Sequence, residues 1–354
     1  MKSTSAPLKK HRPGPLGNYE LYLGYACNRN CRFCFVEKKD RRAFSAPLSY
    51  REICGNLYSA RAKGFRSLAL LGGEPTLNRD LAKIIRSAKR LGYERVLLFS
   101  NGIRLADAGC AGELVSAGLD AVNLNIPSHV PGVFERLTRS PGGFALLLKA
   151  LGNLAALKTP VSAVCVLNKL NHAALPEYAG FYGGLGIRVF TLQHMKFQGN
   201  VSSLFMKGNP DINALKVSMT DCAPGIKAMT RYCLDNALYP PFVEHMVPCV
   251  LKNYESRLLD FHQAPSRTGN YLCLHPDGVN SATWDIAYKD RVRLPVCAAC
   301  VHSPRCYGIE KNYLKVYGGS EFKAVRSQPV PFYARLRGAK LKLAKASIAE
   351  GMAL

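Results

Sequence analysis

Short apolar runs alternate with longer stretches of helical spacing between Tyr19 and about His194. In the longer stretches apolar residues recur three and four positions apart, as at Leu81, Ile84 and Ile85, which is the period of a helix with one buried face. Strand–helix units in succession predict a mostly parallel α/β sheet that closes into a partial (β/α)6 TIM-type barrel. The expected strands are Glu20–Tyr25, Ser67–Leu71, Arg95–Phe99, Ala121–Ile126, Val161–Leu167 and Arg188–Gln193.

The alternation fades after Gln193, and residues 196–325 are rich in Cys, Pro, Tyr and Asn without a clear period. We expect a smaller, irregular, cysteine-rich C-terminal domain there. The expected organisation is a flexible basic segment at 1–18, the barrel at 19–200, the cysteine-rich domain at 201–328 and a basic helix at 329–354. In the last segment, Phe332, Leu336, Leu343 and Ile348 have roughly helical spacing, which favours packing on the protein over recruitment of an acidic peptide or RNA.

The composition narrows the class of protein. Of the 354 residues, 48% are hydrophobic, so the chain can bury a full core. It has no apolar signal region near its start and no stretch approaching about 18 uninterrupted apolar residues, so we expect a soluble cytoplasmic protein without a membrane partner. In a reducing compartment, the 13 cysteines favour metal ligation over disulfides. The net charge of +24 fits either a polyanionic partner or a solvated basic surface.

Three cysteines follow the first expected strand within one loop, as Cys27, three residues, Cys31, two residues and Cys34. Closely spaced thiolates suit a soft metal or an iron–sulfur cluster. A structural zinc site normally takes four ligands, often as two separated pairs. Three cysteines leave one metal coordination position without a protein ligand, so the spacing favours a cluster that can bind another ligand there.

This loop resembles the C-x3-C-x2-C signature of the radical S-adenosylmethionine (radical SAM) superfamily, including the aromatic Phe33 before the last cysteine. Further elements resemble the same family at the ends of successive strands: GGEP within Leu70–Pro75, Ser-Asn-Gly at 100–102, and two asparagines where relatives carry Ser-x-Asp. The resemblance covers residues 19 to about 200 and implies a cofactor-binding set. Its members are Phe33, Gly72, Gly73, Glu74, Ser100, Asn101, Asn123 and Asn125.

The resemblance also implies the chemistry. A [4Fe–4S] cluster on the three cysteines would bind the amino and carboxylate groups of S-adenosylmethionine, and Glu74 would accept a hydrogen bond from the ammonium group. One electron, from a donor such as flavodoxin or ferredoxin, would cleave the sulfonium to give a 5′-deoxyadenosyl radical. No catalytic side chain is assigned beyond the cluster, and we expect His129, His172 and His194 to be structural.

A second cysteine group lies near the C-terminus, with Cys297, Cys300 and Cys306 spaced as C-x2-C-x5-C. It resembles the auxiliary-cluster extensions called SPASM and twitch domains, and LHPDGV at 274–279 resembles their hairpin. The resemblance implies one auxiliary [4Fe–4S] cluster whose fourth ligand is Cys249 or Cys273, with structural zinc as the alternative. The other interpreted cysteines, expected to be buried hydrophobes, are Cys54, Cys110 and Cys165.

The substrate is less determined. Enzymes with SPASM or twitch domains mostly modify peptides, so the leading hypothesis is a peptide maturase that abstracts hydrogen from a side chain or α-carbon. The basic surface would attract an acidic precursor peptide. The alternatives are a carbohydrate or secondary-metabolite epimerase or dehydrogenase, and an RNA-modifying enzyme. No recognised RNA-binding module supports the last, so nucleic acid is not the favoured partner.

Overall fold

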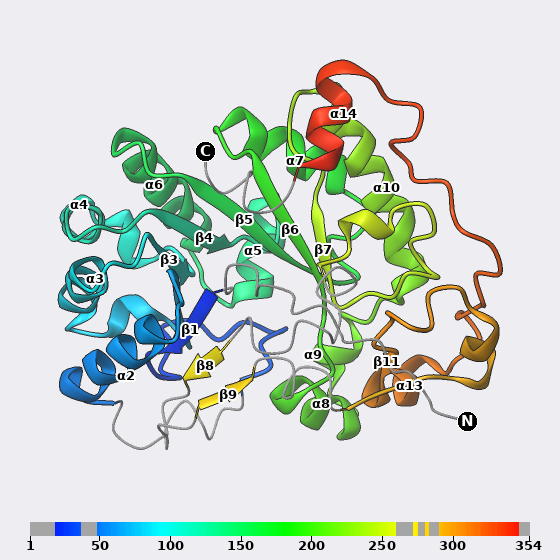
Figure 1. The fold of residues 1–354 in the computed structure, drawn as a ribbon, viewed down its shortest axis with the longest axis horizontal. Helices are drawn as coiled ribbons and strands as arrows, with labels where there is room; N and C mark the ends of the chain where they lie inside the picture. The colour runs from blue at the N-terminus through cyan, green and yellow to red at the C-terminus, as the bar shows by residue number, and fades with distance from the viewer. Residues whose placement is uncertain (1–17, 37–47, 260–271, 275–279, 283–289, 347–354) are drawn as a thin grey trace, which may run out of the picture.

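The computed structural model of the protein describes residues 18–36, 48–259, 272–274, 280–282 and 290–346. Its centre is a curved sheet with the strand order β7-β6-β5-β4-β3-β2-β1-β8-β9, in which the neighbours from β1 to β7 are parallel (Figure 1). The parallel strands are β1 Asn18–Tyr22, β2 Ser67–Leu71, β3 Arg95–Ser100, β4 Ala121–Asn125, β5 Val161–Leu167, β6 Val189–His194 and β7 Phe242–Glu244.

Helices cover the outer face of this half-barrel, as Figure 1 shows for α2 to α4 and α6. The reason is the two-residue alternation along each strand. In β4, for example, Val122 and Leu124 join the buried core under the helices, whereas Asn123 and Asn125 lie on the other, concave face. The helices are α2 Tyr50–Ala62, α3 Leu81–Arg90, α4 Ala108–Ser116, α5 Pro131–Thr138, α6 Gly143–Ala156, α7 Leu175–Gly184, α8 Gly199–Met206, α9 Pro210–Asn213 and α10 Met219–Asp235.

The strand predictions for the barrel are confirmed, with shifts of a few residues at some ends. The sheet has a seventh parallel strand, β7, that the hydrophobic pattern missed. It has only three residues, too few to show a two-residue alternation. The expectation of irregular structure immediately after β6 was wrong for 219–235, which form the long helix α10. Pro224 and Gly225 lie inside this helix, and they obscured its period in the sequence.

Two short strands extend the sheet beyond β1. β8 (Leu272–Leu274) pairs parallel to β1, and β9 (Asn280–Ala282) pairs antiparallel to β8. This confirms a hairpin at the LHPDGV motif, although its turn, 275–279, lies outside the described residues. Cys273 is paired in register with Glu20 of β1.

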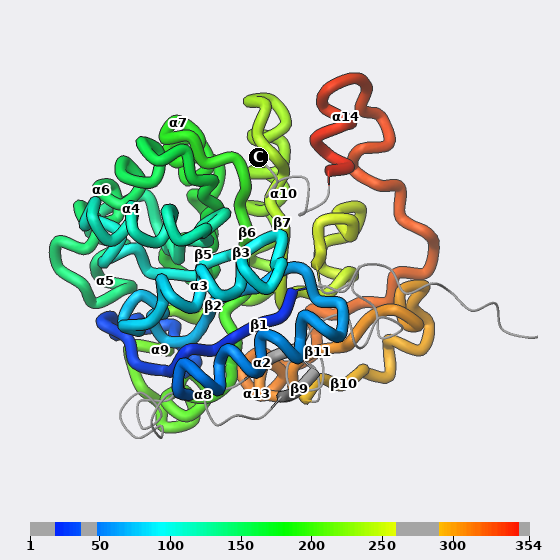
Figure 2. The backbone as a smooth tube through the Cα atoms, turned by 60° about the vertical axis from the view of Figure 1, so that its left-hand side comes forward, coloured from blue at the N-terminus to red at the C-terminus, as the bar shows by residue number. Residues whose placement is uncertain are grey.

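β10 (Arg291–Val292) and β11 (Ile309–Glu310) form a separate antiparallel pair, followed by α13 (Lys311–Tyr317) and, after an extended segment, by α14 (Gly338–Lys345). In Figure 1, β11 and α13 lie at the lower right and β8 at the lower left, and in both views α14 lies far above α13 (Figures 1 and 2). A 3-10 turn, η5 at Pro295–Ala299, lies between β10 and β11.

The basic helix α14 is held by a buried arginine. Arg257, 2% exposed, donates hydrogen bonds to the carbonyls of Ala344 and Ala346 at the end of α14 (3.3 and 3.2 Å). The same guanidinium donates to the carbonyls of Pro240 and Pro241, just before β7. The tail therefore packs on the protein, as its amphipathic spacing favoured.

Among the residues that the structure describes, no helix has the length and apolar character needed to span a bilayer.

Candidate cluster and cofactor sites

The first cysteine loop leaves the carboxyl end of β1 and contains a turn in which the Cys34 amide donates to the Cys31 carbonyl (3.3 Å). All three cysteines, Cys27 included, are half-buried. Two N–H donors approach the Cys27 sulfur: the Arg29 main-chain amide at 3.4 Å and the Asn101 side-chain amide at 3.7 Å. Such donors suit a thiolate that ligates a cluster, because they stabilise its negative charge.

The glycines of the GGEP element allow two loops to touch. After β2, the amide of Gly73 donates to the Gly24 carbonyl, and the amide of Glu74 donates to the Ala26 carbonyl, both at 2.8 Å. A Cβ on Gly72 would lie 2.2 Å from the Gly24 oxygen, and one on Gly73 would lie 2.2 Å from the Ala26 oxygen. Only glycine fits at either position, so this element sets the path of the cluster loop.

Glu74 is 3% exposed, and its carboxylate collects donors from two strand ends. Oε1 accepts from the Thr76 amide and hydroxyl (3.2 and 2.6 Å) and from the Ser100 hydroxyl (2.8 Å). Oε2 accepts from the Asn101 amide at 2.7 Å. A carboxylate has about four acceptor sites shared by its two oxygens, so Oε2 can still accept from a ligand. The expected contact with the ammonium of S-adenosylmethionine stays a prediction.

The two asparagines of β4 fit a polar ligand. Asn123 Oδ1 accepts a hydrogen bond from the Ser162 hydroxyl, but Asn123 Nδ2 and Asn125 Oδ1 are buried without a hydrogen-bond partner in the described structure. Buried polar atoms are normally paired, so these two indicate a site for a molecule that supplies a donor and an acceptor. A ribose would do both, which fits the sequence-based assignment of these asparagines.

Two arginines of the cluster loop are buried. Arg29, 4% exposed, lies with its guanidinium carbon 5.1 Å from the centre of the Phe134 ring. Burial lowers the pKa of Arg29, and the nearby Cys31, Glu74 and Cys27 oppose that shift. The loop thus places the Arg29 guanidinium close to the sulfurs of Cys27 and Cys31 and to the Glu74 carboxylate.

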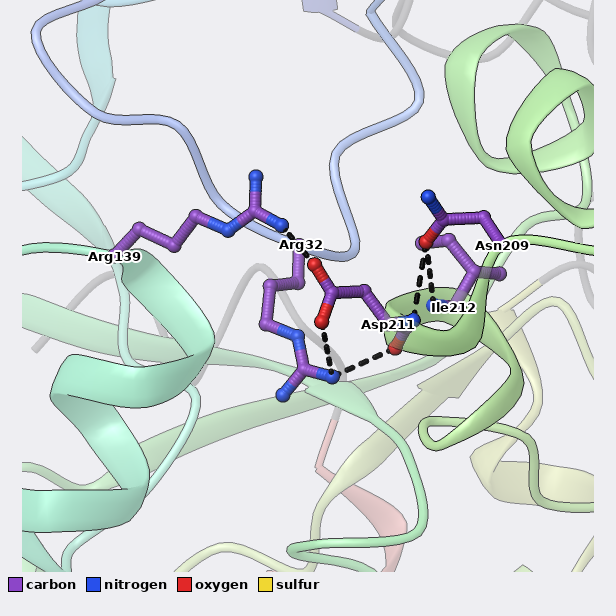
Figure 3. Close-up of polar contacts among 5 residues, drawn as sticks. All are labelled: Arg32, Arg139, Asn209, Asp211 and Ile212. Atoms are coloured by element: carbon purple, nitrogen blue, oxygen red, sulfur yellow. Dashed lines mark hydrogen bonds and ion pairs between the residues drawn. The ribbon is translucent and has the colours of Figure 1, made fainter.

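The second buried arginine, Arg32, ties the loop to the chain after β6. Its side chain donates to the Asp211 carbonyl at 2.7 Å and lies 3.5 Å from the Asp211 carboxylate (Figure 3). The exposed Arg139 also pairs with this carboxylate, and Asn209 caps the short helix α9 by accepting from the amides of Asp211 and Ile212. This network anchors the loop between the end of α5 and α9.

Aromatic residues of the loop divide between core and surface. Phe33, expected to contact the cofactor, is 7% exposed and belongs to the hydrophobic core. Phe35 is 44% exposed, and its carbonyl accepts from the amide of Asn200 at the start of α8 (2.9 Å). The loop is therefore held from β2, α5, α8 and α9 together.

The second cysteine group forms a pocket in the C-terminal region. Cys249, Cys297, Cys300 and Cys306 all line it, although Cys249 is about 50 positions upstream. Of the two candidates for a fourth ligand, Cys249 is thus the one seen beside the other three. In the part of the chain that the structure describes, no three His, Cys, Asp or Glu side chains converge closely enough for a single metal ion.

The electrostatics of this pocket fit a shared metal group. Burial raises the pKa of Cys249 to about 12, and Cys306, Cys300 and Cys297 add to the shift. Burial likewise raises the pKa of Cys306, although the Gly308 amide donates to its sulfur at 3.4 Å. With these raised pKa values both thiols stay protonated, and binding of a metal centre would require them to release their protons.

The remaining cysteines are mixed. Cys165 is fully buried, as expected, and so are Cys222 and Cys233. Cys54 and Cys110 are only half-buried, so the expectation that they are buried hydrophobes was wrong, although Cys110 packs against the hydrophobic core. Both lie on helices at the surface of the protein. In such a helix, residues at the border of the buried face recur with the same three- and four-residue spacing as residues at its centre, so the sequence pattern does not separate half-buried from buried positions.

A polar group at the carboxyl ends of β6 and β7 was missed in the sequence. Gln193 of β6 donates to the carboxylate of Glu244 in β7 at 2.6 Å, and His245 Nε2 lies 3.8 Å from the same carboxylate. His245 has a φ of 63°, which is uncommon for a residue other than glycine. No sequence motif links Gln193 to Glu244. The two residues meet because β6 pairs with β7, a strand that the sequence pattern did not predict.

These features define a class of protein. A half-barrel bears a three-cysteine loop, a glycine–glutamate turn and polar groups on successive strand ends, and the profile of the Radical SAM superfamily matches residues 21–181. Over residues 21–181 the chain is therefore similar to the radical SAM superfamily, whose members use a [4Fe–4S] cluster and S-adenosylmethionine. The C-terminal cysteines, whose spacing resembles that of SPASM and twitch domains, line one pocket.

Sequence relatives and structural neighbours extend the picture. The chain is 30% identical over 203 residues to a protein of Saccharolobus solfataricus named "Probable GTP 3',8-cyclase", a match of 57% of this chain and 64% of that protein. A protein of the same name from Sulfolobus acidocaldarius is 32% identical over 170 residues, covering 47% of this chain and 52% of that protein. The chain thus spans less than two thirds of these relatives.

Two solved structures share the fold over most of the chain. SuiB of Streptococcus suis, bound to precursor peptide SuiA, superposes with a TM-score of 0.63 at 15% identity, over 88% of this chain and 75% of SuiB. The protein anSMEcpe, with bound AdoMet and a peptide, has a TM-score of 0.61 at 12% identity, over 92% of this chain and 95% of that chain. At these identities the likeness concerns the fold.

Proposed function

We propose that the protein cleaves S-adenosylmethionine reductively at a [4Fe–4S] cluster held by Cys27, Cys31 and Cys34, and abstracts hydrogen from a peptide or protein side chain or α-carbon. When bound, the cluster and S-adenosylmethionine supply the radical. The residues of the chain bind and orient the cofactor: Asn123 and Asn125 have free polar atoms for its ribose, and Glu74 has acceptor capacity for its ammonium group.

The observation that supports a peptide substrate is the second cysteine pocket. Cys249, Cys297, Cys300 and Cys306 line one cavity, and the fold likeness to SuiB and anSMEcpe covers 88% and 92% of the chain, which is more than the barrel alone. Both of those structures were solved with a peptide bound. The net charge of +24 favours a peptide with acidic residues, and a small acidic donor such as flavodoxin or ferredoxin as electron source.

A nucleotide substrate is the second candidate, since the sequence relatives bear the name GTP 3′,8-cyclase. The basic character of the chain is compatible with a triphosphate as well. Those matches cover 57% or less of the chain, so they support the radical chemistry more directly than the substrate.

The experiment compares the two substrates by transfer of label. Anaerobically reconstituted protein would be reduced with dithionite and incubated with S-adenosylmethionine and either perdeuterated acidic peptides or deuterated GTP. We expect deuterium in 5′-deoxyadenosine from the peptides and not from GTP. The reverse labelling would contradict the peptide assignment, and a wild type that forms no 5′-deoxyadenosine would contradict the function itself.

A further inference from the structure

Asn101 connects the glycine–glutamate turn to the first cluster cysteine. Its main-chain amide donates to Glu74 Oε2 at 2.7 Å. Its side-chain amide donates to Asn28 Oδ1 at 2.7 Å and points a hydrogen at the Cys27 sulfur, 3.7 Å away. Asn101 therefore lies between a buried carboxylate and a sulfur that is expected to ligate iron.

The orientation of the Asn101 amide is fixed by its surroundings. Asn101 Oδ1 accepts from the amide of Ile103 at 3.0 Å, so the oxygen end is occupied and the nitrogen end must face the cluster loop. Asn101 itself is 8% exposed, so water competes little for these bonds. The polar contact with Cys27 is thus built into the fold.

Glu74 holds the main chain that carries this amide. Its carboxylate accepts from the Ser100 hydroxyl as well as from the Asn101 amide, and the Ser100 oxygen accepts in turn from the Gly102 amide at 3.0 Å. Three consecutive residues at the end of β3 are therefore positioned by one buried carboxylate, which is 3% exposed. Through them Glu74 determines where the Asn101 side chain lies.

A hydrogen bond to a cysteine sulfur has a known consequence for an iron–sulfur cluster. Reduction adds negative charge that is partly delocalised onto the sulfurs, so a donor stabilises the reduced form more than the oxidised form and raises the reduction potential. The effect is larger where the site is partly buried, because the local dielectric constant is low.

We propose that Glu74 and Asn101 form a positioning pair that directs the Asn101 amide at Cys27 and thereby raises the reduction potential of the first cluster. This inference rests on the proposed function, because it requires a cluster at Cys27, Cys31 and Cys34. It assigns Glu74 a role that is exerted before S-adenosylmethionine binds, in addition to any contact with the ammonium group.

The test is the midpoint potential of the first cluster, measured by an electron paramagnetic resonance titration in the absence of S-adenosylmethionine. Asn101→Leu removes the donor without adding charge, and Asn101→Asp keeps the acceptor for Ile103 but removes the donor and adds charge. Asn236→Asp, at the exposed end of α10, is the matched control for the added charge. To report the first cluster alone, every protein would also carry Cys297→Ala and Cys300→Ala.

We expect Asn101→Leu to make reduction about tenfold less favourable, which is about 59 mV for one electron. Asn101→Asp should shift the potential further in the same direction, and Asn236→Asp should leave it unchanged. Glu74→Gln removes a nearby negative charge, which by itself raises the potential, and it also releases the Asn101 amide, which lowers the potential. The rise caused by Glu74→Gln should therefore be smaller in the otherwise unchanged protein than in the Asn101→Leu protein, where only the charge effect remains. If Glu74→Gln fails to take up iron, Ser100→Ala removes a single donor to Glu74 without changing charge and should lower the potential by less than Asn101→Leu does.

Unchanged potentials in Asn101→Leu and Asn101→Asp would overturn the inference, as would an equal rise from Glu74→Gln in the presence and in the absence of the Asn101 amide. Failure of the proposed function is a separate outcome. In that case the reference protein without Asn101 or Glu74 substitutions would itself show no redox-active cluster or no cleavage of S-adenosylmethionine.

Discussion

The amide of Gly73 lies 2.8 Å from the carbonyl oxygen of Gly24, so the turn after β2 is hydrogen-bonded directly to the start of the cluster loop. The two segments approach so closely that neither glycine of the turn can carry a side chain without displacing this backbone. The cluster site thus depends on backbone packing as well as on its cysteines.

Gly73→Ala tests this packing. Its Cβ would lie 2.2 Å from the Ala26 oxygen and 2.3 Å from the Tyr25 oxygen, so the cluster loop must move. We expect loss of iron from the first site and a fall in the free energy of unfolding of about 1–3 kcal/mol. Iron analysis and denaturant unfolding measure both effects.

The matched control is Gly152→Ala, in the exposed interior of α6, where a Cβ meets nothing within 4 Å. There alanine should stabilise the protein by about 0.5–1 kcal/mol. Equal stability changes at the two glycines would contradict the packing argument.

Any one of Cys27→Ala, Cys31→Ala or Cys34→Ala should abolish the release of 5′-deoxyadenosine under dithionite, because each removes an iron ligand of the first cluster. Chromatographic detection of 5′-deoxyadenosine provides the measurement. Cys54→Ala, on the surface helix α2, is the control and should retain activity. Wild-type release from a Cys27→Ala protein would mean that the loop does not hold the reactive cluster.

The second cysteine pocket predicts separate metal binding. A protein with all three loop cysteines replaced by alanine should still hold about one cluster, and Cys249→Ala in that background should lose it. Iron, sulfide and zinc analyses distinguish the outcomes. Stoichiometric zinc would establish a structural ion, and full iron retention after Cys249→Ala would identify another fourth ligand, for which Cys273→Ala is the next variant.

Arg257 predicts the behaviour of the basic tail. Replacing it by methionine leaves carbonyls of Pro240, Pro241, Ala344 and Ala346 without their donor. We expect a loss of about 2–4 kcal/mol in the free energy of unfolding. Faster proteolysis within 338–346 should accompany it. Arg337→Met, which removes only local backbone contacts on the surface, should change stability little.

His194 predicts sensitivity to acid. It is 2% exposed, and burial lowers its pKa to about 4, so the folded protein keeps the ring neutral while the unfolded chain takes up a proton near pH 6.5. The stability contributed by the neutral ring is therefore complete above pH 6.5 and is lost as pH falls toward 4, by about 3 kcal/mol in all. Denaturant unfolding of wild type and His194→Gln at pH 7 and pH 4.5 should show a smaller pH dependence in the variant; equal dependence would exclude His194 as its source.

The sequence by itself determined the features that are local along the chain. Three cysteines within eight positions must share a loop, and short apolar runs placed β2 and β5 at their observed ends. The same pattern put the glycine–glutamate turn at the carboxyl end of β2, where parallel barrels carry their functional groups. These inferences hold because neighbouring positions constrain one another through covalent geometry and hydrogen-bond period.

The tertiary structure alone decided which distant residues meet. Cys249 reaches the other pocket cysteines, Arg32 reaches Asp211, and Gln193 meets Glu244, each across 40 or more intervening positions. The spacing of such pairs carries no period, so their contact depends on the path of the folded chain. The short strand β7 shows the physical reason: three residues form a strand here because β6 offers a paired edge, and not because their own sequence requires it.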